Sequence, residues 1–240
     1  MLKNKTAIVT GSSKGLGREI AICLAKNGAN IGIHYNKSYK SANELKGEIE
    51  SLGSKTLLLK ADLTKPEDAK NMFSVTYKKF KRIDILVNNV GNFLFKDIDK
   101  VSFEEWKYIL DTTLNSTFLC CKECLPYMMK NKCGRIINIG DASADKVTAN
   151  IKRTPYIIGK VGVLILTKSL ALSYAKHNIT VNMVSPGIME NSTFKPSLEE
   201  IPIGRYGKFR EITNTIMFLL SNNEDYITGT NILVSGGWKL

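Results

Sequence analysis

Strand-like and helix-like patterns alternate along this chain from one end to the other. Short apolar runs separate longer stretches in which apolar residues recur at helical spacing, an order typical of a parallel sheet with helices on both faces. The pattern predicts a doubly wound α/β protein. The expected strands are Lys5–Thr10, Asn30–Tyr35, Thr56–Lys60, Asp84–Asn88, Gly134–Ile139, Ile179–Val184 and Asn231–Val234, and the expected helices are Lys14–Asn27, Ser38–Leu52, Pro66–Phe80, Ser102–Lys130, Thr154–Lys176 and Arg210–Leu220.

One segment does not follow this alternation. Positions 187–208 contain Pro196, Pro202, Gly204 and Gly207 and show weak periodicity. Proline and glycine interrupt regular structure, and connecting segments of this kind often carry binding residues. We expect a short substrate loop here, with a short helix, lying over a site.

The composition is that of an ordinary globular protein. With 240 residues, 43% of them apolar, the chain can bury the core of one domain spanning 1–240. No repeat, secretion signal or apolar run long enough to span a bilayer is found, so a cytoplasmic protein with no membrane partner is expected. The net charge of +12 favours anionic partners, such as a phosphorylated cofactor or an acidic carrier protein. Because the lysines are spread along the chain, a solvated surface is the simpler explanation, and no nucleic acid partner is expected.

The five cysteines are expected to be reduced thiols. Cys120, Cys121 and Cys124 crowd one expected helix, while both histidines lie far away in sequence. A metal site would need further ligands near these thiols. Buried thiols without a metal are therefore the better interpretation.

A glycine-rich turn, Thr10–Gly17, follows the first expected strand and opens the first helix. Free backbone N–H groups and the positive end of a helix suit a pyrophosphate. Gly11 and Gly15 permit a tight turn and close approach, and Gly17 allows the helix to pack on the sheet. An ordinary turn is the alternative interpretation.

The residues after the second strand indicate which dinucleotide is preferred. NAD sites usually place a carboxylate there to hold the ribose hydroxyls, but this chain has Tyr35, Asn36, Lys37 and Ser38. Lys37 offers positive charge to a 2′-phosphate, and Lys14 in the glycine turn could add a second charge. NADP(H) is therefore expected, the alternative being that Lys37 is simply a solvated loop residue.

Tyr156 and Lys160 are one helical turn apart and so lie on one face of an expected helix. Tyrosine normally loses its proton near pH 10, and a nearby cation lowers that pKa. The pair could thus move a proton while hydride reaches or leaves a substrate.

Together, these motifs resemble the short-chain dehydrogenase/reductase family over nearly the whole chain. Further segments similar to family signatures are Ala61-Asp62-Leu63, Asn88-Asn89-Val90-Gly91, Ser185-Pro186-Gly187, Tyr226-Ile227-Thr228-Gly229 and Gly236-Gly237. The resemblance implies a seven-stranded Rossmann sheet, hydride transfer with NADP(H), and assembly as a homotetramer or dimer. The cofactor residues that it implies are Gly11, Ser13, Lys14, Gly15, Leu16, Gly17, Tyr35, Asn36, Lys37, Ser38, Asp62, Leu63, Asn89, Gly91, Pro186, Gly187 and Ile188.

Two catalytic positions depart from the family pattern. The family's serine after the fifth strand, which positions the substrate carbonyl, aligns with Asp141, although Ser143 would serve if the loop shifts register. The family's asparagine in a proton relay aligns with Thr113, because Asn115 would point to another side of the helix. Tyr156, Lys160, Asp141 and Thr113 are the expected catalytic residues.

The resemblance leaves two substrate classes open. The overall sequence resembles 3-oxoacyl-(acyl-carrier-protein) reductases, which implies a small-molecule or carrier-bound acyl substrate. A carboxylate at position 141 would repel a developing alkoxide and raise the pKa of Tyr156, so it suits a substrate that brings donors or positive charge. Pteridine reductases resemble the chain here, with Asp141-Ala142 and a ring-stacking aromatic where Phe93 lies. A non-catalytic NADPH-binding sensor or structural subunit is the alternative from another class.

Overall fold

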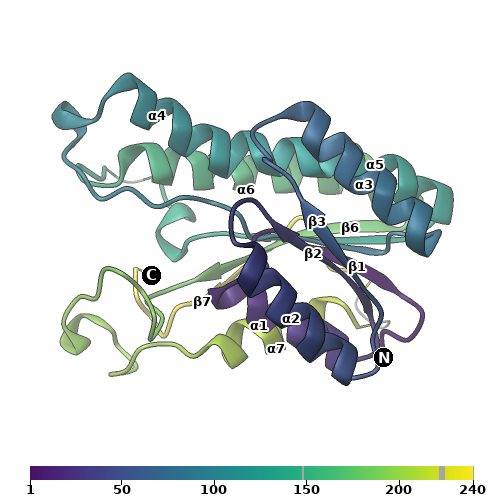
Figure 1. Cartoon of the computed structure of the whole chain (residues 1–240). Coiled ribbons are helices and arrows are strands. Elements are labelled where there is room, and N and C mark those ends of the chain that lie inside the picture. Colours follow the sequence, from purple (N-terminus) through teal and green to yellow (C-terminus); the bar gives the residue numbers. More distant parts are fainter. Residues whose placement is uncertain (148, 222–224, 240) are drawn as a thin grey trace.

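Seven parallel strands form one sheet, which is seen nearly edge-on in Figure 1. The computed structural model describes residues 1–147, 149–221 and 225–239. The strands are β1 (Thr6–Val9), β2 (Asn30–Tyr35), β3 (Thr56–Lys60), β4 (Ile85–Asn88), β5 (Gly134–Ile139), β6 (Ile179–Pro186) and β7 (Asn231–Val234). They lie in the order β3-β2-β1-β4-β5-β6-β7, and every neighbouring pair is parallel. The expected doubly wound α/β fold is confirmed.

Helices cover both faces of the sheet in two layers (Figure 1). The layer drawn below the sheet has α1 (Gly15–Lys26), α2 (Tyr39–Ser51) and α7 (Phe209–Leu219), and the layer above it has α3 (Pro66–Phe80), α4 (Phe103–Leu110), α5 (Ser116–Asn131) and α6 (Thr154–Tyr174).

The two cores follow from the alternation of side chains along each strand. On β1, Ala7 and Val9 pack in the core beneath α1, α2 and α7, while Ile8 packs in the core beneath α3 and α5. Cys120, Cys121 and Cys124 are buried in this second core, as expected. Burial raises the pKa of Cys121 to about 12, so this thiol stays protonated and unreactive at neutral pH.

The expectation of a single helix over Ser102–Lys130 is wrong. Helix α4 ends at Leu110, a π-helical turn occupies Asp111–Asn115, and α5 then begins. The hydroxyl of Thr112 donates to the carbonyl of Tyr108, and the hydroxyls of Ser116 and Thr117 likewise donate one turn back. Such side-chain bonds compete for backbone carbonyls and loosen the regular ladder, which accounts for the wider turn.

The carboxyl ends of the strands form the edge that carries the site. Chain connections diverge to opposite sides between β1 and β4, and a crevice opens at such a switch point. The segment 187–208 lies over this edge and contains one 3₁₀ turn, Leu198–Glu200, as expected. Short 3₁₀ turns also occur at Ile98–Lys100, Ala142–Ala144 and Ala175–His177.

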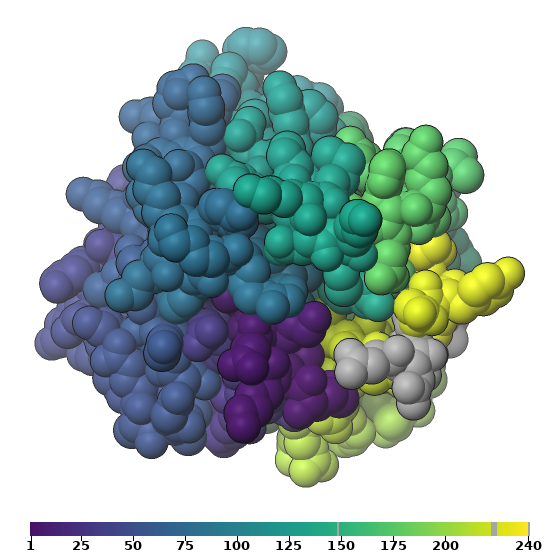
Figure 2. Space-filling view, turned by 90° about the vertical axis from the view of Figure 1, so that its right-hand side faces the viewer, coloured from purple at the N-terminus to yellow at the C-terminus, as the bar shows by residue number. Residues whose placement is uncertain are grey.

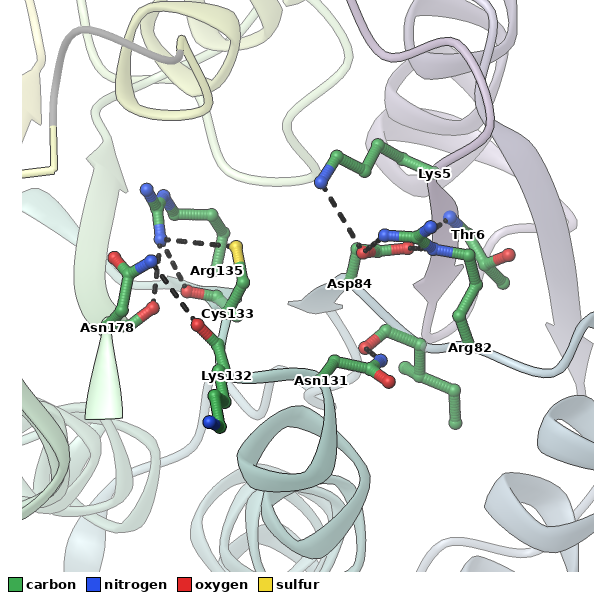
Figure 3. Close-up of polar contacts among 11 residues, drawn as sticks. Lys5, Thr6, Arg82, Asp84, Asn131, Lys132, Cys133, Arg135 and Asn178 are labelled. Carbon is green, nitrogen blue, oxygen red and sulfur yellow. Dashed lines mark hydrogen bonds and ion pairs between the residues drawn. The ribbon is translucent and has the colours of Figure 1, made fainter.

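A polar network fastens the opposite, amino edge of the sheet (Figure 3). Asp84 is buried and accepts hydrogen bonds from the backbone N–H of Thr6 at 2.8 Å and from Arg82 at 2.7 and 2.5 Å. Arg135 donates to the carbonyl of Asn178 at 3.2 Å. These contacts join β1 to β4, and β5 to the start of β6.

The amino edge also carries most of the excess positive charge. Figure 2 looks onto this edge, with the N-terminal residues in purple near its middle. Among the described residues at strand entrances and adjoining helix ends, carboxylates are few. The basic residues there are Lys3, Lys5, Lys26, Lys55, Lys78, Lys79, Lys81, Arg82, Lys130, Lys132, Arg135 and Lys176, and the carboxylates are Glu50, Asp84 and Asp225.

Helix α6 is more apolar than the sequence analysis expected. With the 3₁₀ turn after it, Thr154–His177 is 24 residues long, and its most apolar 18-residue window has a mean hydropathy of 1.5. Length and composition alone would therefore allow it to span a membrane. In the structure one side of the helix packs on the sheet, where Val163 and Leu164 are buried against Met183 of β6. A core helix with a second apolar face accounts for this composition.

Candidate active site

The glycine turn at the end of β1 presents free backbone donors. Gly11 and Gly15 have φ angles of +62° and +55°, a region in which side chains are strained. A Cβ on Gly17 would lie 2.4 Å from the carbonyl oxygen of Gly11, so the close packing of α1 on the turn requires glycine. Lys14, the residue before α1, makes no side-chain cap, which leaves the first N–H groups of the helix available to an anion.

His34 supports this turn, a role that the sequence analysis missed. The backbone N–H of Gly11 donates to Nδ1 of His34 at 2.8 Å, so the proton is on Nε2, which lies 3.1 Å from the carbonyl oxygen of Ala61. Burial lowers the pKa of His34 to about 4 and keeps the ring neutral. The sequence places a histidine at the end of β2 but gives no signal of its long-range partner.

The residues expected to hold the adenosine half of a dinucleotide surround a cavity of about 400 Å³. Asp62 is the carboxylate among its described lining residues, and it follows β3, whereas an NAD-type carboxylate follows β2. Hydrogen bonds from Thr64 are the main reason why the pKa of Asp62 is lowered. Of the expected cofactor residues, Gly11, Ser13, Tyr35, Asn36, Lys37, Ser38, Asp62 and Leu63 line this cavity.

A neighbouring cavity of about 270 Å³, here called the active-site cavity, brings together three of the four expected catalytic residues and the expected substrate residue Phe93, whereas Thr113 does not line it. Tyr156, Lys160, Asp141 and Phe93 all line it. Segments that flank the glycine turn and β4 contribute to both cavities, so the two adjoin. The expected cofactor residues that line the active-site cavity are Leu16, Asn89, Gly91, Pro186, Gly187 and Ile188, whereas Lys14, Gly15 and Gly17 line neither cavity.

Tyr156 and Lys160 project from the first turns of α6. Lys160 is 4% exposed, its Nζ donates to the carbonyl oxygen of Ile139 at 2.6 Å, and it lies 5.6 Å from the centre of the Tyr156 ring. Burial lowers the pKa of Lys160 to about 8. Burial and then Asp141 raise the pKa of Tyr156, and Arg153 lowers it. The direction is opposite to the one expected from Lys160, and it keeps the phenol protonated, as a proton donor must be.

Thr113 lies behind this pair, within the π-helical turn. Its hydroxyl is buried and has no hydrogen-bond partner among the described residues. A Cβ added to Gly91 would be 3.6 Å from this hydroxyl and 3.4 Å from Nζ of Lys160, which places both groups beside one glycine. Asn115 instead bonds Asp111 on the surface. Thr113 is therefore the residue of this turn that could take part in a proton relay.

The structure distinguishes Asp141 from Ser143. Asp141 lines the active-site cavity, whereas Ser143 does not. The backbone N–H of Ser143 donates to Oδ1 of Asp141 at 2.9 Å, and its hydroxyl bonds the same oxygen. Ser143 thus orients the carboxylate from behind and does not face the position where a substrate would bind.

Arg153 and Trp238 are cavity residues that the sequence analysis missed. Arg153 precedes α6 and is 7% exposed, and its guanidinium carbon lies 5.8 Å from the centre of the Trp238 ring. Phe194 from the segment 187–208 also lines the cavity. Arg153 lies only three positions before Tyr156, but its approach to Asp141 and Trp238 depends on the folded loops.

Comparisons with known proteins identify the family of this chain. A model of the family described as Enoyl-(Acyl carrier protein) reductase matches residues 11–239. The chain shares more than a third of its residues with two relatives over almost the full lengths of the proteins. The chain belongs to the short-chain dehydrogenase/reductase family.

Its relatives include three bacterial proteins named 3-oxoacyl-(acyl-carrier-protein) reductase. The chain is 36% identical to that of Staphylococcus epidermidis over 98% of both proteins, and 34% identical to that of Staphylococcus aureus over 99% of both. It is 35% identical to the Synechocystis protein over 98% of this chain and 97% of the relative. A crystal structure described as a short-chain alcohol dehydrogenase of Sinorhizobium meliloti 1021 superimposes with a TM-score of 0.92 at 30% identity, covering 99% of this chain and 97% of that one.

Proposed function

We propose that this protein is an NADPH-dependent reductase that converts a carbonyl group into an alcohol. The observation that carries the proposal is the placement of Tyr156 beside the buried Lys160 on the wall of the active-site cavity, next to a glycine turn with free donors. Membership of an oxidoreductase family supports it.

The residues of the site divide the chemistry between them. A reduced dinucleotide held beside the glycine turn would supply the hydride that adds to the carbonyl carbon. Tyr156 donates its phenolic proton to the carbonyl oxygen, and the raised pKa of Tyr156 keeps that proton in place until the oxygen becomes basic. Lys160 is held by the carbonyl of Ile139, and with Thr113 it can return a proton from solvent to the phenolate.

The residues of the neighbouring cavity fit NADPH. The uncapped start of α1 suits the pyrophosphate, and the exposed Lys37 after β2 suits a 2′-phosphate. Asp62 lies after β3, where the resemblance implies contact with the adenine.

A 3-oxoacyl thioester is the first substrate class, because the curated relatives carry that activity in their names. Most of the excess positive charge lies at the amino edge, away from the active-site cavity, so the charge does not favour docking of an acidic carrier protein at the site. Asp141 and Phe93 favour a second candidate, a pteridine, in which a ring C=N bond and not a carbonyl group would be reduced. The Phe93 ring meets the Tyr156 ring edge-on at 5.2 Å and is 40% exposed, so it is available to stack on a flat substrate.

We also propose that the protein is a homo-oligomer, a tetramer or dimer. Ile158, Ile165 and Leu172 lie at seven-residue intervals on α6 and are 43%, 61% and 87% exposed. Phe118 on α5 is 46% exposed. An uncovered apolar stripe of this kind is typical of a surface that packs against another subunit.

Replacing Tyr156 by Phe tests the proposed chemistry. NADPH oxidation would be followed with acetoacetyl thioesters, dihydropterins, quinones and diketones, and Tyr156→Phe should lower kcat by at least about a hundredfold, because it removes only the proton donor. NADPH affinity, measured by fluorescence titration, should stay within about twofold. Tyr174→Phe is the control, since Tyr174 lies at the far end of α6. Full turnover in Tyr156→Phe would refute the mechanism, and NADPH binding without turnover of any carbonyl by the unmodified protein would favour a sensor.

A further inference from the structure

Arg153 and Asp141 lie side by side on the wall of the active-site cavity without forming a hydrogen bond. Nη1 of Arg153 lies 3.8 Å from Oδ2 of Asp141, which is beyond hydrogen-bond length. The two side chains are only 9% and 14% exposed, and both line the cavity. Their charges attract each other, but no direct hydrogen bond joins them, and we call this arrangement the open pair.

Another ion pair of the same chain shows what a closed pair looks like. At the amino edge, Arg82 donates two hydrogen bonds to Asp84, with lengths of 2.7 and 2.5 Å (Figure 3). That fork-like geometry is the strong arrangement for arginine and a carboxylate. The open pair of Arg153 and Asp141 lacks these hydrogen bonds, so its geometry differs from that of an ion pair with a purely structural role.

Both members of the open pair have unused hydrogen-bonding capacity. Oδ1 of Asp141 accepts two bonds from Ser143, while Oδ2 accepts none from the described residues. Nη2 of Arg153 reaches the hydroxyl of Ser143 at 3.4 Å, while Nη1 makes no hydrogen bond to the described part of the chain. A charged donor or acceptor that loses water without gaining a partner destabilises the complex more than a neutral one does. A ligand that fills the cavity must therefore offer partners to Nη1 and Oδ2.

Aromatic side chains define the shape of that ligand. Phe93, Phe194 and Trp238 line the same cavity. Trp238 is 4% exposed and lies against the Arg153 guanidinium, which restrains the cation in one orientation. Aromatic side chains beside fixed polar groups suit a planar ring.

We propose that Arg153 and Asp141 form a paired recognition edge for planar carbonyl substrates that carry a lactam-type group, in which a ring N–H adjoins a carbonyl oxygen. Nη1 of Arg153 donates to the lactam oxygen, and Oδ2 of Asp141 accepts from the ring N–H. This inference rests on the proposed reductase function and names its substrate class. A ketone on a plain acyl chain presents acceptors only and leaves Oδ2 of Asp141 facing another lone pair.

The first test compares three planar diketones in the unmodified protein. Isatin has the N–H, N-methylisatin lacks the donor, and indane-1,2-dione replaces the nitrogen by carbon. We expect kcat/KM for isatin to exceed that of the other two by about ten- to a hundredfold, the range for a hydrogen bond to a charged group. Equal values would overturn the recognition edge and leave the reductase function standing.

Variants assign the preference to the two residues. Asp141→Ala should bring the isatin to N-methylisatin ratio close to one, whatever its effect on kcat. Arg153→Met should raise KM for both compounds about tenfold, because both keep the lactam oxygen. Lys152→Met is the control: Lys152 is an exposed neighbouring cation that lies over Phe95 and does not line this cavity, and its variant should keep the ratio. An unchanged ratio in Asp141→Ala would contradict the assignment.

A binding measurement separates this inference from the proposed function. Oxindole has the lactam edge but no reducible ketone, and N-methyloxindole lacks the donor. Calorimetric titration of the protein with NADP⁺ present should give at least about tenfold tighter binding of oxindole. Equal affinities, or binding of neither, would overturn the inference. Tighter binding of oxindole in a protein that reduces no carbonyl would refute the reductase function alone.

Discussion

His34 shows how one buried side chain can make the stability of the protein depend on pH. Its pKa is about 4 in the folded protein, and an unfolded histidine has a pKa near 6.5. Between these values the unfolded chain binds a proton that the folded chain excludes, so stability falls as pH falls through this window. We expect the contribution of His34 to drop by about 2 kcal/mol between pH 7.5 and 5.

Urea unfolding at several pH values would measure this effect. His34→Gln removes the titrating ring, so the variant should be less stable at pH 7.5 but should lose about 2 kcal/mol less than the parent on going to pH 5. His177→Gln is the control, because His177 is exposed at the amino edge. Parallel losses in all three proteins would show that His34 does not titrate in this window.

Lys37 tests the choice of dinucleotide at a single position. Lys37→Ala should weaken NADPH binding by about tenfold and change NADH binding by less than about twofold, because only NADPH carries the 2′-phosphate. Lys46→Ala is the matched control, since Lys46 lies on α2 and faces Glu50 at 4.0 Å, away from the cavity. Dissociation constants from fluorescence titration would decide. Equal weakening of both cofactors would remove Lys37 from phosphate recognition.

Residues that act through local spacing are those that the sequence could predict. Tyr156, Lys160 and Asp141 belong to short motifs, and the structure places all three at one cavity. Arg153 and Trp238 escaped notice because they meet only after the C-terminal segment folds back over the start of α6. No motif or spacing in the sequence predicts the contact between these two side chains.

Among the elements, the strands were the most predictable. The expected bounds of β2, β3, β5 and β7 agree with the structure, because a run of apolar residues between turn residues leaves little choice of register. The π-helical turn between α4 and α5 was not predictable, because its cause is a set of hydroxyl to carbonyl bonds that apolar periodicity does not report. That turn carries Thr113, so the element missed is one that shapes the site.

The amino-edge network makes a prediction about how the strands are held together. Asp84→Ala leaves the backbone N–H of Thr6 without its partner and should lower the free energy of unfolding by about 2–3 kcal/mol. Lys5→Ala is the control, because Lys5 reaches Asp84 only at 3.6 Å and is partly exposed, and it should cost at most about 1 kcal/mol. Urea unfolding measures both. Similar losses in the two variants would contradict a specific role for the bond to Thr6.

For the molecule as a whole, the apolar stripe on α6 makes the clearest prediction. Leu172→Glu places a charge at its most exposed position and should shift the protein to a smaller species in size-exclusion chromatography with light scattering. Ser173→Glu is the control, because Ser173 is an exposed neighbour that adds the same charge beside the stripe. Retention of the parent mass by Leu172→Glu would contradict a subunit interface on this stripe.

The uneven distribution of lysines makes the protein an electric dipole, with its positive pole on the edge opposite the active-site cavity. In an electric field, a protein with such a dipole rotates into alignment before it makes contact with a charged surface. On a negatively charged bead or electrode, the protein would therefore adsorb through its amino edge. The active-site cavity would then face the solvent and stay accessible to dissolved reactants.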